Sequence, residues 1–84
     1  MYKEDQNKLI NIIHDDDQIH VFINASSRNK KRIEQVLEDT FYYLSQIYYQ
    51  QYETEYDDNQ FYFTVADYKE LEAFKNIFYR ELRK

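Results

Sequence analysis

The chain of 84 residues contains no cysteine, no glycine and no proline. Without cysteine there is no disulfide bridge, no cysteine-ligated zinc site and no thiol nucleophile. Without glycine there is no phosphate-binding loop, no dinucleotide fingerprint and no nucleophile elbow, because each of these motifs needs glycine at fixed positions. The three serines have no recognisable histidine partner motif. We therefore expect no enzyme activity, no catalytic residue and no cofactor.

Long apolar runs and an excess of positive charge are also missing. No apolar stretch approaches the roughly 20 residues of a membrane-spanning helix, and residues 1–8 do not resemble a signal peptide. The 16 acidic residues outnumber the 11 basic ones, which gives a net charge of -5. This charge disfavours binding of the protein as a whole to nucleic acid or to a membrane surface. A cytoplasmic protein is expected.

Aromatic residues are abundant instead, with ten tyrosines and six phenylalanines. A chain of this length forms one domain with a small core, and small domains without disulfides or metals often depend on oligomerisation. Large aromatic side chains bury much area and suit such a core. The composition therefore predicts an aromatic core, and we expect a homodimer.

The hydrophobic pattern predicts an α+β fold in a single domain spanning residues 1–84, without internal repeats. Stretches with helical spacing alternate with stretches of period two, which favours the order helix, strand, helix, strand, helix. The expected elements are residues 3–14, 18–24, about 27–52, 60–66 and the stretch that follows Asp67. The result would be a helix-rich domain whose small two-stranded sheet, parallel or antiparallel, packs on a long central helix.

Local signals refine the two later helices. Ser26 or Ser27 is expected to cap the central helix, and Asp67 with Glu70 forms a capping box for the last one. The expected inward residues are Ile33, Val36, Leu37, Thr40, Leu44 and Ile47, then Leu71, Phe74, Phe78 and Leu82. A central helix of nearly 40 Å would overhang a strand of about 23 Å, which favours a partner subunit at its far end.

An outward row of tyrosines is the main candidate binding surface. Tyr42 and Tyr49 lie about 160–180° from the core stripe of the central helix, and Tyr56 continues the row if the helix lasts that long. Exposed tyrosines among acidic groups are typical of protein-binding surfaces, although the first helix or a second subunit could also cover them. The predicted partner-binding residues are Glu38, Asp39, Tyr42, Tyr49, Glu53, Glu55, Tyr56, Asp57 and Asp58.

The charges of the central helix oppose its macrodipole. Its start is basic and its end is acidic, whereas the dipole favours the reverse. The basic residues are Arg28, Lys30, Lys31 and Arg32. Three interpretations remain open: an anion or nucleic-acid site at the helix start, an antiparallel helix pair across a two-fold axis, or a solvated surface whose charges cost little.

The segment from His14 to His20 contains two histidines and three adjacent aspartates. Imidazole and carboxylate groups bind divalent metals. Adjacent carboxylates at a corner between two elements cannot all converge on one ion, however, and no further ligand follows at a recognisable spacing. We interpret the segment as a solvated turn and expect no metal.

Size, acidity and exposed tyrosines together favour a function in binding. The character is that of small acidic phage or mobile-element proteins that occupy the nucleic-acid or partner-binding surface of a host enzyme, as anti-CRISPR, anti-restriction or replication-blocking factors and DNA mimics do. This is an analogy of composition. Two alternatives are a dimeric nucleic-acid-binding protein that uses the basic helix start, and an antitoxin or immunity protein.

Overall fold

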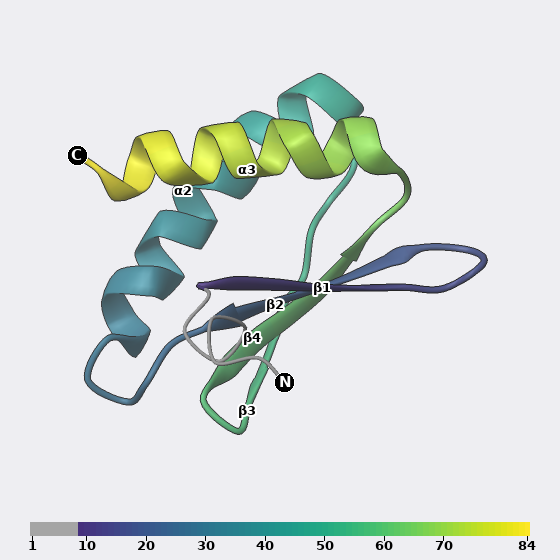
Figure 1. Cartoon of the computed structure of the whole chain (residues 1–84). Helices are drawn as coiled ribbons and strands as arrows, with labels where there is room; N and C mark the ends of the chain where they lie inside the picture. Colours follow the sequence, from purple (N-terminus) through teal and green to yellow (C-terminus); the bar gives the residue numbers. More distant parts are fainter. Residues whose placement is uncertain (1–8) are drawn as a thin grey trace.

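The computed structural model describes residues 9–84, which form a four-stranded antiparallel sheet with two helices on one face (Figure 1). The elements in chain order are β1 (Ile10–His14), β2 (Ile19–Asn24), α2 (Lys30–Tyr48), β3 (Glu55–Asp57), β4 (Gln60–Val65) and α3 (Tyr68–Leu82). The strands lie in the order β1-β2-β4-β3. Each of the two hairpins therefore supplies one central strand and one edge strand.

This architecture corrects the predicted fold, in which a first helix preceded a two-stranded sheet. Residues 3–8 of that helix lie outside the described residues, and the end of it is strand β1. The spacing of Leu9, Ile10 and Ile13 fits a helix, but the stretch is rich in β-branched isoleucine, which also suits a strand. Antiparallel pairing of β1 with β2 decides between the two, because Ile10 is then buried while Ile13 points away from the helices.

The three consecutive aspartates form the turn of the first hairpin. The Asp15 carboxylate accepts hydrogen bonds from the backbone N–H groups of Asp17 at 2.9 Å and Gln18 at 3.3 Å. The Asp15 N–H in turn donates to the Gln18 carbonyl at 3.1 Å. Aspartate side chains stabilise turns by such bonds to the backbone that follows. The segment interpreted as a solvated turn is thus a turn, and it joins two strands rather than a helix and a strand.

Helix α2 is shorter at both ends than predicted. It begins after Asn29 rather than after Ser26 or Ser27, and it ends at Tyr48. Its 19 residues span about 28 Å. The residues that follow lead into β3, a strand that was not among the predicted elements. A helix of this length does not overhang the sheet greatly, so the argument for a dimer from an overlong helix fails. Neither helix of residues 9–84 is long and apolar enough to cross a membrane.

The core lies between the helices and one face of the sheet, and it is centred on aromatic rings. Phe63 of β4 packs against Phe74 of α3 and Phe41 of α2, with ring centroids 4.8 and 5.0 Å apart. The predicted inward residues of both helices are buried, except that Leu82 is half-buried and the Ile47 side chain is 54% exposed. The aromatic core expected from the composition is therefore confirmed, and Ile47 is not part of it.

The start of α3 holds a buried carboxylate. Asp67 caps the helix by accepting the Glu70 N–H at 3.0 Å, as the capping motif predicts. Glu70 itself is only 2% exposed; it accepts the Ala66 N–H at 2.8 Å and the Tyr52 hydroxyl. Burial and the hydrogen bond to Glu70 raise the pKa of Tyr52 well above its ordinary value. Glu70 thus fastens the segment after α2 to the start of α3.

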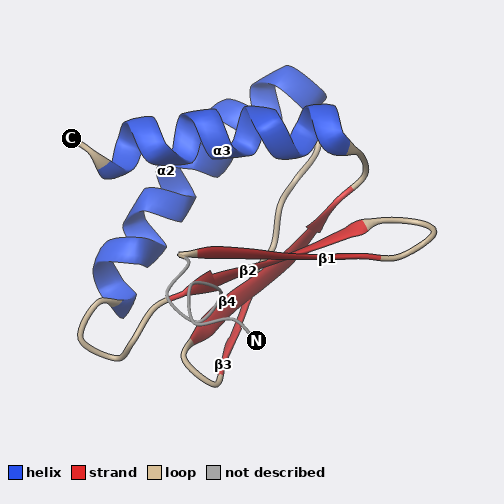
Figure 2. Ribbon diagram, viewed as in Figure 1, coloured by secondary structure: helices blue, strands red, loops and turns tan. Residues whose placement is uncertain are grey.

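The second face of the sheet is not covered by any helix of residues 9–84 (Figure 2). Side chains on the central strands alternate strictly: Val21 and Ile23 are fully buried, whereas His20 and Phe22 between them are half-buried. Strand β4 repeats the pattern, with Tyr62 half-buried on this face. We call this surface the open sheet face.

Candidate protein-binding surfaces

Large apolar side chains are exposed in the C-terminal half of α2 and at its C-cap: Tyr42, Tyr43, Ile47 and Tyr49. Tyr42 and Tyr49 point away from the core stripe, and we call these two rings, together with Tyr43, which packs against Tyr42, the tyrosine face. Tyr42 is 61% exposed and Tyr49 is 90% exposed, so the predicted outward direction of these two rings agrees with the structure. The alternative in which another part of the chain covers them is not realised within the described residues. Exposed apolar side chains that gather on one surface are typical of interaction sites.

The surroundings of the tyrosine face are acidic and partly ordered. Tyr43 packs edge-on against Tyr42, with ring centroids 5.3 Å apart, and the Arg80 guanidinium lies 5.0 Å above the Tyr43 ring. Of the predicted neighbours, Glu38 is exposed and Asp39 is half-buried with a 3.2 Å hydrogen bond from Gln35. No lysine or arginine occurs on α2 after its first turn. The face therefore offers aromatic area, with carboxylates on α2 and the Arg80 guanidinium on α3 beside it.

Tyr49 adopts an uncommon backbone conformation at the end of α2. Its φ of 55° and ψ of 42° lie in the left-handed region, and its N–H closes the helix by donating to the Ser45 carbonyl at 2.7 Å. For a residue with a Cβ atom this conformation costs roughly 1–2 kcal/mol. Glycine normally occupies such a helix-ending position. Here the position carries a nearly fully exposed tyrosine.

The predicted acidic residues of the second hairpin lie on the open sheet face, apart from the tyrosine face. Glu55, Asp57 and Asp58 line a hollow of about 310 Å³ together with two aromatic rings. The rings belong to Phe22 and Tyr62, whose centroids are 5.0 Å apart. We call this feature the acidic hollow. Neither Phe22 nor Tyr62 was predicted to be a contact residue, although each stands on the less buried face of an alternating strand.

Two predicted contact residues belong to neither surface. Tyr56 could continue the tyrosine row only if α2 reached it, and it lies in β3 instead. Its hydroxyl donates to the Ala25 carbonyl at 2.7 Å, and the Lys30 ammonium lies 4.6 Å above its ring. Glu53 is exposed in the segment between α2 and β3. The predicted surface is thus divided into two, with Tyr56 packed inside the domain.

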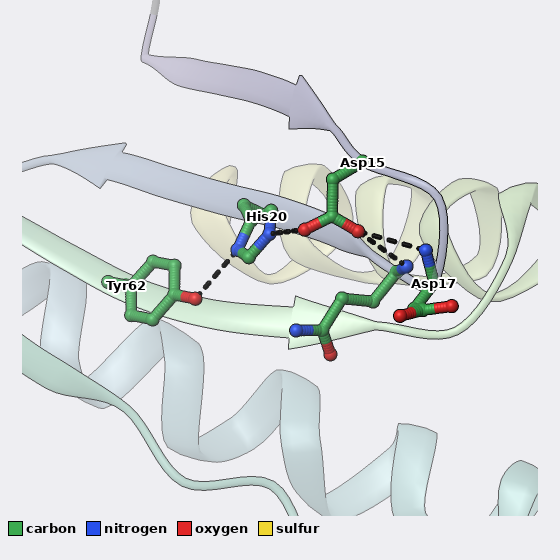
Figure 3. A network of polar contacts seen from close by, with 5 residues as sticks. Asp15, Asp17, His20 and Tyr62 are labelled. Carbon is green, nitrogen blue, oxygen red and sulfur yellow. Dashed lines mark hydrogen bonds and ion pairs between the residues drawn. The ribbon is translucent and has the colours of Figure 1, made fainter.

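A chain of polar contacts crosses the open sheet face from the first hairpin turn to β4 (Figure 3). The His20 ring places Nε2 2.8 Å from the Asp15 carboxylate and Nδ1 2.7 Å from the Tyr62 hydroxyl. A neutral ring that donates from Nε2 and accepts the tyrosine proton at Nδ1 satisfies both contacts. The hydrogen bond from His20, followed by that from the Asp17 N–H, lowers the pKa of Asp15.

A hydroxyl held by a histidine and a carboxylate resembles an activated nucleophile. The surroundings of Tyr62 do not complete such a site. The hollow beside it is lined by three carboxylates, which would destabilise negative charge developing on a substrate. The geometry instead fixes the direction of the Tyr62 ring and ties the first hairpin turn to the sheet.

The basic start of α2 has partners within the fold. Arg32 donates to the Leu82 carbonyl at the end of α3 at 2.7 Å, and Lys30 covers Tyr56. The unfavourable position of these cations on α2 is thereby offset by contacts with other elements. Arg28 and Lys31 remain exposed, and Lys84 lines a hollow together with Arg32. The start of α2 and the end of α3 therefore meet at one corner, which we call the basic corner, although Asp39 and Glu81 also line its hollow.

No group of three or more histidine, aspartate or glutamate side chains within residues 9–84 is placed to hold a metal ion. The two histidines of the first hairpin are separated, since His14 lies against Tyr68, with Nε2 2.6 Å from its hydroxyl, and His20 lies against Tyr62.

Comparison of the chain with protein-family models, curated proteins and solved structures finds no match to any of them.

Proposed function

We propose that the protein is a stoichiometric inhibitor of phage or mobile-element type that binds a host nucleic-acid enzyme and occupies its nucleic-acid or partner-binding surface. Anti-CRISPR, anti-restriction and replication-blocking factors are the classes in question. Its activity is binding, without catalysis. An antitoxin or immunity protein would use the same contacts and differ only in the identity of its target.

The observation that carries this proposal is the exposure of the tyrosine face in a domain whose core is already complete. Burying Tyr42 and Tyr49 against a partner would remove large apolar areas from water, and tyrosine is enriched among the residues that dominate binding energy. The strained backbone of Tyr49 also supports a role of this residue in binding. Strain of this kind persists where the surrounding structure fixes it, and it gathers at functional sites.

The acidic hollow supports a basic partner surface. Its carboxylates and rings suit ammonium or guanidinium groups, which interact favourably with carboxylates and with aromatic faces. The basic groove of a nucleic-acid enzyme presents such groups. Complementary charge would also accelerate the encounter, and this effect would weaken as salt is added.

The test is affinity capture from a lysate of the organism that encodes the protein, treated with nuclease. The wild type is compared with Tyr42→Ala/Tyr49→Ala, with Glu55→Gln/Asp57→Asn/Asp58→Asn, and with the matched control Asp16→Asn/Asp17→Asn. We expect the tyrosine variant to lose the captured protein by at least about tenfold, which corresponds to 1.4 kcal/mol. The control should bind like the wild type. Undiminished capture by the tyrosine variant would contradict the assignment.

A second variant separates binding from folding. Tyr49→Gly relieves the left-handed backbone strain, so we expect the free energy of unfolding to stay constant or to rise by up to about 1 kcal/mol. The same change removes the exposed ring, so capture of the partner should weaken. A variant that is at least as stable as the wild type yet binds less would tie Tyr49 to the partner. Equal binding would show that the ring has no part in the contact.

The basic corner favours one second candidate, a nucleic-acid-binding protein. Lys84, which lines the same hollow as Arg32 and pairs with Glu81 at 3.1 Å, would join the predicted Arg28, Lys31 and Arg32 in such a patch. Affinity for a duplex or a single strand would then fall steeply with salt concentration. The absence of binding in low salt to either form of DNA or RNA would exclude this candidate. Loss of binding on Arg28→Ala/Lys31→Ala would support it.

A further inference from the structure

The outer edge of β1 carries backbone groups that no described strand satisfies. The Asn24 N–H donates to the Leu9 carbonyl at 2.9 Å, so Leu9 is bonded to β2 through its backbone. Along an antiparallel strand, residues whose backbone groups bond to the neighbouring strand alternate with residues whose backbone groups point away from it. Asn11 and Ile13 therefore also bond to β2, and the backbone N–H and C=O groups of Ile10, Ile12 and His14 point outward from the sheet.

The side chains of β1 do not protect this edge. Exposed edges in natural proteins are usually short, charged with lysine, or interrupted by proline, because an open edge pairs with other chains. β1 has the sequence INIIH, without lysine, acid or proline, and Ile13 is 56% exposed. A cavity of about 750 Å³ runs beside the strand, between it and Lys75 and Tyr79 of α3.

The opposite edge is protected in the usual ways. β3 has only three residues, and two of them are the exposed acids Glu55 and Asp57. Pairing of two β3 strands would set carboxylates of like charge against each other. Of the two edge strands formed by residues 9–84, β1 is therefore the one suited to receive another strand.

We propose that a second copy of this chain docks on β1, so that two sheets join edge to edge into one antiparallel sheet. The outward groups pair in register about Ile12, which lies opposite Ile12 of the second copy. Ile10 then lies opposite His14, and the same contact occurs twice. In this arrangement the edge of β1 is the interface of the expected homodimer. The proposal does not depend on the function proposed above.

Self-complementarity argues for a second copy as the occupant. The outward groups of Ile10, Ile12 and His14 are spaced symmetrically about Ile12. A two-fold axis through the Ile12 pair therefore brings each outward group opposite one on the second copy. It also brings the two α3 helices to the same side of the seam. The α3 surface next to β1 carries both signs of charge, since Lys75 lies 3.7 Å from Glu72. Because β3 cannot pair, the assembly closes at two chains.

Sedimentation equilibrium over a micromolar concentration series tests the proposal. We expect the wild type to approach the mass of a dimer as concentration rises. Ile12→Pro should remain a monomer, because it deletes an outward N–H and leaves the bonds to β2 intact. The control Ile12→Val keeps the N–H and should dimerise. A wild type that is monomeric throughout, or an Ile12→Pro variant that dimerises, would overturn the proposal.

Amide hydrogen exchange provides a second measurement on the unmodified protein, so the result does not depend on the folding of the proline variant. The amides of Ile10, Ile12 and His14 should become protected as concentration rises, while those of Asn11 and Ile13 should be protected at every concentration. Protection of all five amides in the monomer would show that the edge is covered from within the chain, and the proposal would fail.

Discussion

The first half of the chain, from β1 to α2, and the second half, from β3 to α3, both form a hairpin followed by a helix. Their strand registers correspond. Ile13 pairs with His20 in the first hairpin, and Glu55 pairs with Tyr62 at the equivalent place in the second. The sequences of the halves show no repeat. The shared architecture therefore arises from alternation on the central strands, which both halves keep, rather than from particular residues.

The halves differ in how their helices are stabilised. α3 has a capping side chain, Asp67, an acid in its first turn and Arg80 in its last. α2 has no side-chain cap, no acid in its first turn and no base in its last. Since local signals do not favour α2, its stability has to come from packing and from tertiary contacts such as that of Arg32 with the end of α3. The half with the weaker local signals also carries the tyrosine face and the open edge.

The largest expected effect comes from the aromatic core that joins the halves. Phe74 of α3 is fully buried and packs on Phe41 from the first half and Phe63 from the second. Phe74→Ala should lower the free energy of unfolding by about 3–5 kcal/mol, measured by urea denaturation. Because such a loss approaches the total stability of a small domain, Phe74→Leu serves as a milder variant with a smaller loss in the same direction. Two-state unfolding near wild-type stability for Phe74→Ala would contradict this view of the core.

A pair of cap substitutions tests the difference between the helices. Asp67→Ala removes a side chain that accepts the Glu70 N–H, so it should cost about 1 kcal/mol. Asn29→Ala removes a residue that makes no side-chain cap bond, so its effect should stay within about 0.5 kcal/mol. Both values come from urea denaturation under the same conditions. Equal losses would show that the two helix starts are stabilised alike.

The sequence predicted those parts of the fold where local and tertiary preferences agree. The second strand of each hairpin, the capping of α3 by Asp67 and the helical core stripes are confirmed, apart from Ile47. The two edge strands were not found. The sequence of β1 is equally compatible with a helix, because the spacing of Leu9, Ile10 and Ile13 fits both the helical and the strand period. Only the pairing with β2 distinguishes the two. β3 is too short for its alternation to be visible.

As with the fold, only part of the candidate surfaces could be predicted from the sequence. The outward direction of Tyr42 and Tyr49 follows from helical geometry alone, because both lie within or directly after α2. The position of Tyr56 depends on where α2 ends, and no glycine or proline marks that end. The meeting of Phe22 with Tyr62 depends on which strands are neighbours in the sheet. Contacts between distant segments require the topology, which the sequence pattern did not provide.

The smallest expected effect concerns the contact by which α3 holds the end of the first half. Burial and the Glu70 hydrogen bond raise the pKa of Tyr52 above its ordinary value of 10.0. The folded state therefore favours the protonated hydroxyl. This stabilisation is complete below pH 10.0 and is lost as the pH rises further, because the unfolded chain then releases a proton that the folded chain retains.

Tyr52→Phe should accordingly flatten the alkaline limb of the stability profile. The free energy of unfolding is measured from neutral pH to about pH 11 for the wild type, for Tyr52→Phe and for the exposed control Tyr79→Phe. The wild type and the control should lose stability with the same slope above pH 10.0, and Tyr52→Phe with a shallower one. Tyr52→Phe should also be the least stable of the three at neutral pH, since Glu70 loses a hydrogen-bond donor. If all three profiles were parallel, the hydroxyl of Tyr52 would not be what fastens the two halves together at this point.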